Sequence, residues 1–191
     1  MSLCVFFLVL PAAYGQQLDL GFAMSGLLAP SATSASGNFS PQSIGGGAFP
    51  GFNGDFLFRH NFGVGAEVNW RAKQNVYRGF QPFRPILYDF NGVWAPRLGK
   101  KASAELQAGI GAASIRFYNP FVTCNFFGCS NFSSSNHFLG HFGGGVRLYV
   151  FHNVFIRPEA HYYLIHNNFE FSGANSTRVG ITLGYSLRGE Q

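Results

Sequence analysis

The chain has 191 residues and a formal net charge of +5, but only 11% of its residues are charged, whereas 47% are hydrophobic and 17% aromatic. A soluble domain carries about 25% charged residues, so this composition disfavours a surface that faces water throughout. The 13 Lys and Arg are scattered, with no run longer than Lys100-Lys101, which excludes the basic stripe of a nucleic-acid-binding protein.

The first 15 residues, MSLCVFFLVLPAAYG, form an apolar run that ends in the small-x-small triplet Ala13-Tyr14-Gly15. This pattern is typical of a secretory signal peptide, although the usual positive residues before the run are missing. We expect residues 1–15 to be the signal and residues 16–191 to be the exported domain. The alternative is that the run is a buried N-terminal strand. Beyond it, no run approaches the roughly 20 apolar residues of a membrane helix.

The rest of the chain alternates between apolar and polar or small residues, which predicts β-strands. The alternation is clearest at 178–187, where Val179, Ile181, Leu183, Tyr185 and Leu187 share one face. Equally regular segments lie at 62–71, 102–112 and 154–164, and weaker ones at 18–25, 48–59, 86–94 and 138–150. None of the eight segments has helical periodicity.

Short and long connections alternate between these segments. The short ones lie at 60–61, 96–101 and 151–153, and the long ones, rich in Ser, Asn, Pro and Gly, at 29–42, 72–83, 117–137 and 167–175. Bacterial outer-membrane barrels combine an even strand number with short periplasmic turns and longer outside loops. The sequence therefore predicts an all-β fold, an eight-stranded antiparallel up-and-down transmembrane β-barrel with both termini periplasmic.

The charged residues of the predicted strands share the polar face. This face contains mixed acids and arginines but no lysine, since Lys73, Lys100 and Lys101 all fall in connections. Arginine suits buried ion pairs, and eight strands leave room inside only for side chains. We therefore expect an interior polar network of Asp55, Arg59, Glu67, Arg71, Asp89, Glu105, Arg147, Arg157, Glu159, His161 and Arg178, together with Asp19. The alternative is a secreted, soluble, lipocalin-like binding barrel with the faces reversed.

Aromatic residues are expected near both ends of the apolar face. Membrane barrels place such residues at the headgroup level on both sides of the bilayer. The candidates are Phe56, Phe58, Phe62, Trp94 and Tyr185 at the periplasmic side, and Trp70, Phe138 and Tyr162 at the outer side. The alternative is that these rings form the core of a soluble sandwich.

The signal-like start, the eight up-and-down strands and the aromatic-bearing last strand resemble the OmpA/OmpX/opacity-like outer-membrane β-barrel domain family. The resemblance extends from about Leu18 to Leu187. It implies that the C-terminal strand is read by the outer-membrane assembly machinery, and the segment GITLGYSL has the required alternation, although residues 188–191 follow it. It also implies that the bilayer and lipopolysaccharide are the partners of a monomeric barrel that needs no cofactor.

Chemistry elsewhere in the sequence is sparse. Glu159, His161 and His141 lie on the polar face and are the candidates for a lipid A-modifying enzyme, but no serine can be placed beside either histidine. We expect no enzyme activity and an interior hydrogen-bond network instead. Cys124 and Cys129 in an exported, loop-like segment favour a disulfide, whereas a metal site there would need more ligands than His137 alone.

These observations predict an outer-membrane barrel with a structural or surface-interaction role. Its lumen would be closed by polar side chains, and its extracellular loops would carry the function. The segment from Asn125 to Gly128, between the two cysteines, is the most distinctive surface candidate.

Overall fold

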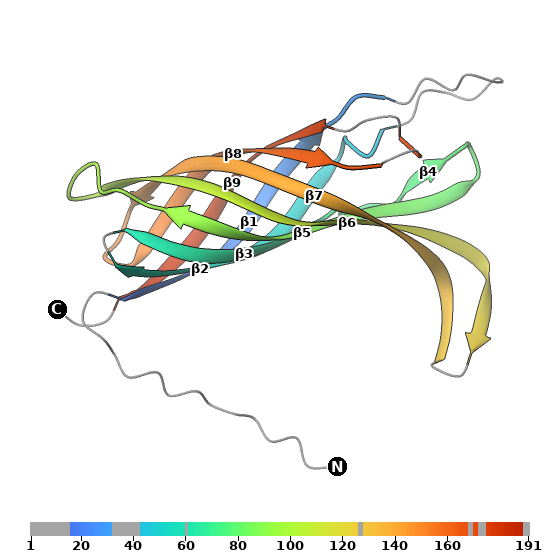
Figure 1. Cartoon of the computed structure of the whole chain (residues 1–191), viewed down its shortest axis with the longest axis horizontal. Coiled ribbons are helices and arrows are strands. Elements are labelled where there is room, and N and C mark those ends of the chain that lie inside the picture. Colours follow the sequence, from blue (N-terminus) through green and yellow to red (C-terminus); the bar gives the residue numbers. More distant parts are fainter. Residues whose placement is uncertain are drawn as a thin grey trace, which may run out of the picture.

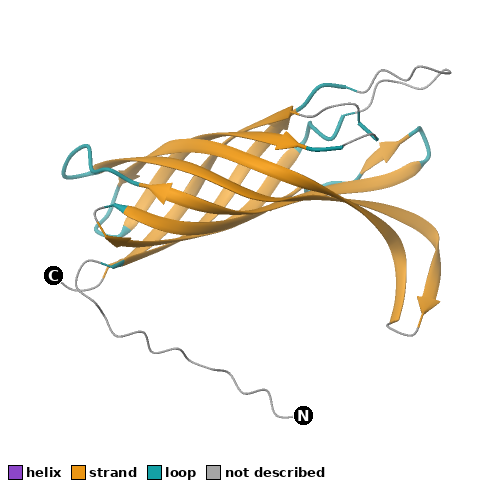
Figure 2. Cartoon of the chain, viewed as in Figure 1, coloured by secondary structure: helices purple, strands orange, loops and turns teal. Residues whose placement is uncertain are grey.

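The computed structural model describes residues 16–31, 43–59, 61–125, 128–167, 170–171 and 175–188. The predicted signal peptide, residues 1–15, lies outside the described residues. The described part consists of strands and connections without a helix (Figure 2). Accordingly, these residues include no helical segment of the length and apolarity needed to cross a bilayer.

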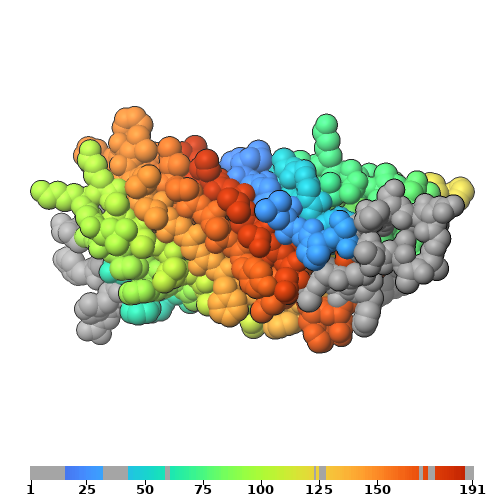
Figure 3. All heavy atoms as spheres, turned by 90° about the horizontal axis from the view of Figure 1, so that it is seen from above, coloured from blue at the N-terminus to red at the C-terminus, as the bar shows by residue number. Residues whose placement is uncertain are grey.

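The described residues form nine antiparallel strands, and eight of these close into a ring. The ring runs β1, β2, β3, β5, β6, β7, β8, β9 and back to β1, because β3 pairs with β5 and β1 pairs with β9. Figure 3 shows this closure, with the blue N-terminal strand beside the red C-terminal strand. The strands are β1 Gln17–Leu28, β2 Ala48–Arg59, β3 Phe62–Trp70, β4 Asn75–Tyr77, β5 Gln81–Trp94, β6 Ala102–Asn125, β7 Gly128–Tyr149, β8 Val154–Ile165 and β9 Asn175–Arg188.

The two ends of the barrel differ (Figure 1). At one end, which we call the inner end because the sequence predicts it to be periplasmic, Gln17 pairs with Arg188, and the connections β2–β3, β5–β6 and β7–β8 are short. At the outer end lie the long connections, the three-residue strand β4 and the far part of the β6–β7 hairpin. The predicted eight-stranded up-and-down barrel is confirmed.

Two predicted loops are wrong in part, because residues 72–83 contain β4 and the start of β5, and most of residues 117–137 lie in β6 and β7. Residues 117–137 were expected to be irregular, but β6 continues to Asn125 and β7 begins at Gly128. Residues 118–125 and 128–135 form the two arms of a projecting hairpin that curves away from the barrel, beyond the last β5–β6 pair, Phe83 with Phe117. The pairing of β6 with β7 is interrupted by a register shift after Tyr118 and continues beyond it, with Thr123 opposite Ser130.

Alternation separates the two faces of the barrel. On β8, Phe155, Arg157, Glu159, His161 and Tyr163 are buried inside, and the residues between them are exposed. Large apolar side chains cover the outside, for example Phe90 at 70%, Ile110 at 61% and Leu183 at 57% exposure. Because side chains alternate with a period of two, the same pattern that turns polar groups inward turns this apolar belt outward.

All eight predicted interface aromatics point outward from the barrel. Phe62 and Trp94 stack at the inner end, with ring centroids 6.1 Å apart, and Trp70 packs against Phe52 toward the outer end at 5.9 Å. The exposed fraction is 46% for Phe58, 58% for Phe138, 41% for Tyr162 and 47% for Tyr185, and Phe56 is half-buried. Their position at the membrane interface stays a prediction.

Candidate functional site

The inward positions of the middle of the barrel hold most of the predicted polar residues. Each strand from β1 to β9, β4 excepted, contributes at least one charged or amide side chain at a buried position. Nine of the eleven predicted network residues are at most 5% exposed: Asp55, Glu67, Asp89, Glu105, Arg147, Arg157, Glu159, His161 and Arg178.

The other two predicted network residues have different positions. Arg71 is not in the network, because β3 ends at Trp70 and residue 71 begins the outer connection. Its guanidinium lies against Gly46 and Gly47, both of which have φ near +79°. Arg59 ends β2 at the inner end, and its side chain is outside the described residues.

The inner part of the network is centred on two arginines. Arg147 bonds Asp19, Asp55 and Glu105, with 3.0 Å between its Nη2 and Asp55 Oδ2. Arg157 bonds Asp55 at 3.1 Å, Glu159 at 2.8 Å through Nε, and Glu105. Asp55 and Glu105 therefore bridge the two guanidinium groups. This arrangement ties β1, β2, β6, β7 and β8 together across the lumen.

The outer part of the network is centred on Glu67. Arg178 donates from Nη2 to both oxygens of Glu67 at 2.9 Å, and the Tyr163 hydroxyl donates to Glu67 Oε1 at 2.7 Å. His141 stacks on Tyr163, with 4.8 Å between the ring centroids, and its Nε2 is 2.8 Å from His161 Nδ1. His141 Nδ1 lies 2.7 Å from Asn91 Oδ1 and 3.2 Å from Asp89 Oδ1.

Among the side chains that the structure describes, carboxylates outnumber guanidinium groups in this interior. Six acids are buried there against three arginines, namely Asp19, Asp55, Glu67, Asp89, Glu105 and Glu159 against Arg147, Arg157 and Arg178. The expected set had six acids and five arginines; of these arginines, Arg71 lies in a connection, and the side chain of Arg59 is outside the described residues.

One trio in this cluster has the ligand types of a metal site. One potential ligand atom from each of Glu67, His141 and His161 lies within 4.8 Å of the others. Both Glu67 oxygens, however, already accept hydrogen bonds from Arg178, whose fixed positive charge opposes a cation at the same place. The geometry therefore favours a hydrogen-bonded ion pair over a cation site.

The outer half of the interior is apolar, which the sequence analysis missed. A cluster of buried side chains fills it, and Ile44, Phe171 and partly buried Tyr77 from outside the ring close over it. Tyr77 lies 5.2 Å from Phe117 and 5.3 Å from Phe171, and Phe83 lies 4.9 Å from Phe171 between ring centroids. Every second residue of β5, β6 and β8 points inward. Extending this alternation beyond the charged positions would have revealed the apolar cluster from the sequence. The buried members are Leu27, Ile44, Phe49, Phe83, Leu87, Ala113, Ile115, Phe117, Leu139, Tyr163, Ile165 and Phe171.

The network gives a first testable prediction at Tyr163. Replacing Tyr163 with Phe removes the hydrogen bond to Glu67 but keeps the ring stacked on His141. We expect a loss of about 1.5–3 kcal/mol of unfolding free energy, because the acceptor is a buried carboxylate. Urea unfolding of the refolded protein in lipid vesicles measures this. The matched control is Tyr162→Phe, one residue away and 41% exposed on the outside, which should leave the value unchanged.

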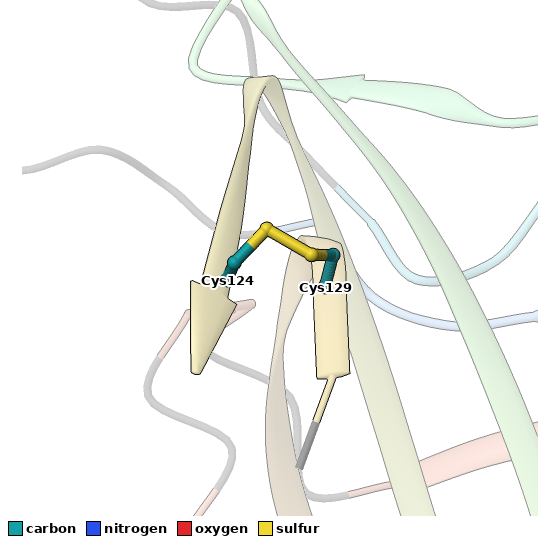
Figure 4. The surroundings of a disulfide bond; sticks show 2 residues. All are labelled: Cys124 and Cys129. Carbon is teal, nitrogen blue, oxygen red and sulfur yellow. A yellow bond between two sulfur atoms is a disulfide. The ribbon is translucent and has the colours of Figure 1, made fainter. Parts of the chain in front are cut away.

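The predicted cysteine pair is bonded in the structure. Cys124 and Cys129 face each other across the projecting hairpin and form a disulfide near its tip (Figure 4). Phe126 and Phe127, within the proposed surface segment, lie outside the described residues. Because the hairpin projects beyond the ring, the disulfide constrains the hairpin tip and not the barrel.

A second prediction follows from this position. The double substitution of Cys124 and Cys129 by Ser should speed protease cleavage within residues 118–135 and leave the urea midpoint of the barrel unchanged. The reason is that the disulfide closes a short loop whose opening exposes none of the barrel core. Limited proteolysis followed by mass spectrometry provides the measurement. A lowered barrel midpoint would contradict the assignment of the disulfide to local stabilisation.

Comparisons with known proteins rest on structure alone, since no family model and no curated protein sequence matches the chain. Ail, the attachment invasion locus protein of Yersinia pestis, solved in complex with the heparin analogue sucrose octasulfate, is 13% identical with a TM-score of 0.56; the match covers 92% of this chain and 100% of Ail. Neisserial surface protein A is 10% identical with a TM-score of 0.59, over 91% of this chain and 97% of that protein.

The N-terminal β-barrel domain of Pseudomonas aeruginosa OprF is 9% identical with a TM-score of 0.55, over 88% of this chain and 97% of that domain. These matches span nearly the whole of each barrel, and the identities are low enough that they establish the fold alone. The ring of eight antiparallel strands, with its apolar outside and charged inside, is the OmpA/Ail-like outer-membrane β-barrel fold.

Proposed function

We propose that this protein is a monomeric integral barrel of the bacterial outer membrane, with both termini on the periplasmic side and a surface-interaction role at its outer end. The observation that carries the proposal is the inverted distribution of polarity. Charged groups fill the interior, whereas Phe90, Ile110 and Leu183 are among the many large apolar side chains exposed outside. A barrel can expose such a belt to lipid because closure satisfies its backbone hydrogen bonds.

The same distribution argues against the soluble lipocalin-like alternative. A soluble barrel would bury its apolar face and expose its charges, and monomeric soluble proteins rarely expose apolar patches larger than a few hundred Å². Here six of the eight acids of the chain are at most 5% exposed inside the barrel. A bilayer is the environment that this outer surface fits.

A closed lumen is part of the proposal. Arg147, Arg157 and Arg178 are at most 1% exposed and bond carboxylates from opposite walls, and the apolar cluster lies between them and the outer end. Near the inner end, a small pocket of about 90 Å³ lies beside Gln17 and Arg147. We therefore expect no wide pore and assign the function to the outer connections.

The projecting hairpin is the outstanding feature of the outer end. Residues 118–135 contain no Asp, Glu, Lys or Arg, and Phe121 is 79% and Val122 64% exposed. An uncharged surface with exposed apolar side chains, held away from the barrel, suits contact with another molecule. The similar protein Ail, named for attachment and invasion, is consistent with such a role.

The enzymatic alternative has less support. His141 is fully buried and His161 is 2% exposed, and their partners are Asn91, Asp89, Glu159 and each other. A lipid A-modifying enzyme needs its catalytic groups at a position that a lipid can reach. We therefore propose a structural role for both histidines.

Epitope insertion in whole cells tests the topology on which this function depends. An epitope after Gly79, in the outer connection, should be reached by antibody on intact cells. An epitope after Lys100, in the short β5–β6 connection at the inner end, should be reached only after the outer membrane is opened. Labelling in the reverse order would contradict the orientation, and recovery of the protein from the soluble fraction would contradict the membrane location.

A further inference from the structure

The outer end carries an excess of positive charge. Of the eight acids in the chain, six lie inside the barrel and Glu190 lies near the C-terminus, which leaves Glu170 as the acid of the outer connections. Five cations lie at the outer end: Arg71, Lys73, Arg78, Arg84 and Arg116. Glu170 accepts a hydrogen bond from Ser135 at 2.7 Å and lies 3.3 Å from His137, so it is already engaged.

Two of these arginines face each other across neighbouring strands. Arg84 on β5 is the register partner of Arg116 on β6. The flanking residues Phe83 and Phe117 are buried inside, so both arginines lie at outward positions, where each is half-buried. Like charges directly opposite in an antiparallel pair are destabilising, and this pair has no carboxylate to offset the repulsion among the described residues.

The surroundings fix the two side chains without neutralising them. The Arg116 guanidinium carbon lies 4.8 Å from the centre of the Phe132 ring, a cation–π contact. Arg84 donates from Nη2 to the carbonyl oxygen of Ala72 at 3.3 Å. The Nε–H of each arginine has no acceptor within the described part of the chain. Ser134 on β7 is the register partner of Arg116 and adds an exposed hydroxyl beside it.

The height of the pair places it at the outer edge of the apolar belt. Arg84 lies two residues beyond Ile86, the register partner of Trp70, which is roughly 7 Å along the strand at the usual rise per residue. Trp70 is one of the aromatic residues predicted at the headgroup level. The next groups outward are therefore level with the phosphates of the outer leaflet.

We propose that Arg84 and Arg116 form a binding site for a phosphate group, which the headgroup of a phosphorylated outer-leaflet glycolipid supplies. Guanidinium groups match phosphate oxygens in pairs of parallel hydrogen bonds, and one doubly charged phosphate would neutralise both arginines and remove their repulsion. This site rests on the proposed membrane orientation and specifies the partner of the outer rim. Free phosphate from solution is the competing source of the same chemistry.

The test uses the protein refolded in zwitterionic vesicles with or without bisphosphorylated lipid A. We expect the double variant Arg84→Gln, Arg116→Gln to bind lipid A at least ten-fold more weakly than the wild type, by native mass spectrometry of the protein released from the vesicles. The matched control is Lys73→Gln, Arg78→Gln, which removes the same charge from the same end and should stay within about two-fold of the wild type. Equal weakening by the two double variants would overturn the site, because it would show attraction by the overall charge of the outer end.

The sign of a stability change provides an independent readout. In zwitterionic vesicles without lipid A, whose headgroup phosphates are each balanced by their own cation, Arg84→Gln should raise the urea midpoint, because it removes the repulsion from Arg116. In vesicles with lipid A, the same substitution should lower the midpoint. A change of the same sign in both lipids would contradict the proposal.

Two further measurements test whether the phosphate groups of lipid A, and not free phosphate, occupy the site. With lipid A that lacks its phosphates, the wild type should bind no more tightly than the double variant Arg84→Gln, Arg116→Gln. Inorganic phosphate at millimolar concentration should neither raise the urea midpoint of the wild type nor displace lipid A from it. Displacement by inorganic phosphate would overturn the lipid as the source. Gel mobility with and without boiling shows whether each sample forms a barrel. A wild type that forms no barrel would contradict the proposed function. Folded variants that bind lipid A as tightly as the wild type would contradict this site alone.

Discussion

Replacing Arg147 with Met should lower the unfolding free energy by about 3–5 kcal/mol, the range seen when one partner of a buried ion pair is removed. Met keeps much of the side-chain length and removes the charge. Arg147 is fully buried and bonds Asp19, Asp55 and Glu105. These three carboxylates would lose their shared partner, although Arg157 still contacts Asp55 and Glu105. Urea unfolding in lipid vesicles, followed by tryptophan fluorescence, measures the loss.

Two companion variants show whether charge is the cause. Arg97→Met removes a cation from the exposed β5–β6 connection and should change the unfolding free energy by less than about 0.5 kcal/mol. Adding Glu105→Gln to Arg147→Met should recover part of the loss, because it removes one of the carboxylates left without Arg147. Additive effects of the two substitutions would contradict a direct ionic contact between them.

Replacing Gly111 with Ala should cost about 1–3 kcal/mol, the usual penalty for adding atoms to a well-packed interior. Gly111 on β6 is the register partner of Asp89 on β5. A methyl group at Gly111 would lie 2.6 Å from the Asp89 Cα and still closer to the carbonyl oxygen of Tyr88. Because both of these atoms belong to the backbone, the two strands would have to separate.

Gly92 on β5 is the matched control for Gly111. It lies on the outer face of the same strand pair, and a methyl group there would meet only the carbonyl oxygen of Ala108, at 3.7 Å. Gly92→Ala should therefore be neutral or stabilising by up to about 1 kcal/mol, through the reduced freedom of the unfolded chain. A comparable loss from both variants, measured in the same urea series, would show that any glycine replacement weakens this strand pair.

The ring and its two faces could be predicted from the sequence because both depend on a period of two. That period is strict in segments such as 178–187, where β9 turns Arg178 inward and Val179 outward. The alternation of short and long connections then fixed which strand ends lie together. These features depend on local pattern and chain length, which a single sequence contains.

The filling of the barrel could be predicted only in part. Arg147 and Glu105 are recognisable because a charge at a regular strand position must point inward or outward with its neighbours. The apolar cluster around Phe83 and Phe117 was missed because the segments that contain them were assigned to loops. Continuing the inward alternation of the two strands would have placed Phe83 and Phe117 inside, whereas a contact between distant segments, such as Phe83 with Phe171, has no local pattern. Arg71 shows the reverse error, since the strand ended one residue earlier than its pattern suggested.

The central claim is that this barrel turns its apolar face to lipid and its charges inward. Residues 16–191, refolded in detergent, should migrate faster on a gel before boiling than after it, with a strand-type circular dichroism spectrum, because closure around the ring resists unfolding by the gel detergent. Residues 16–191 that are folded and monomeric in plain buffer, with no change of mobility on boiling, would contradict the claim.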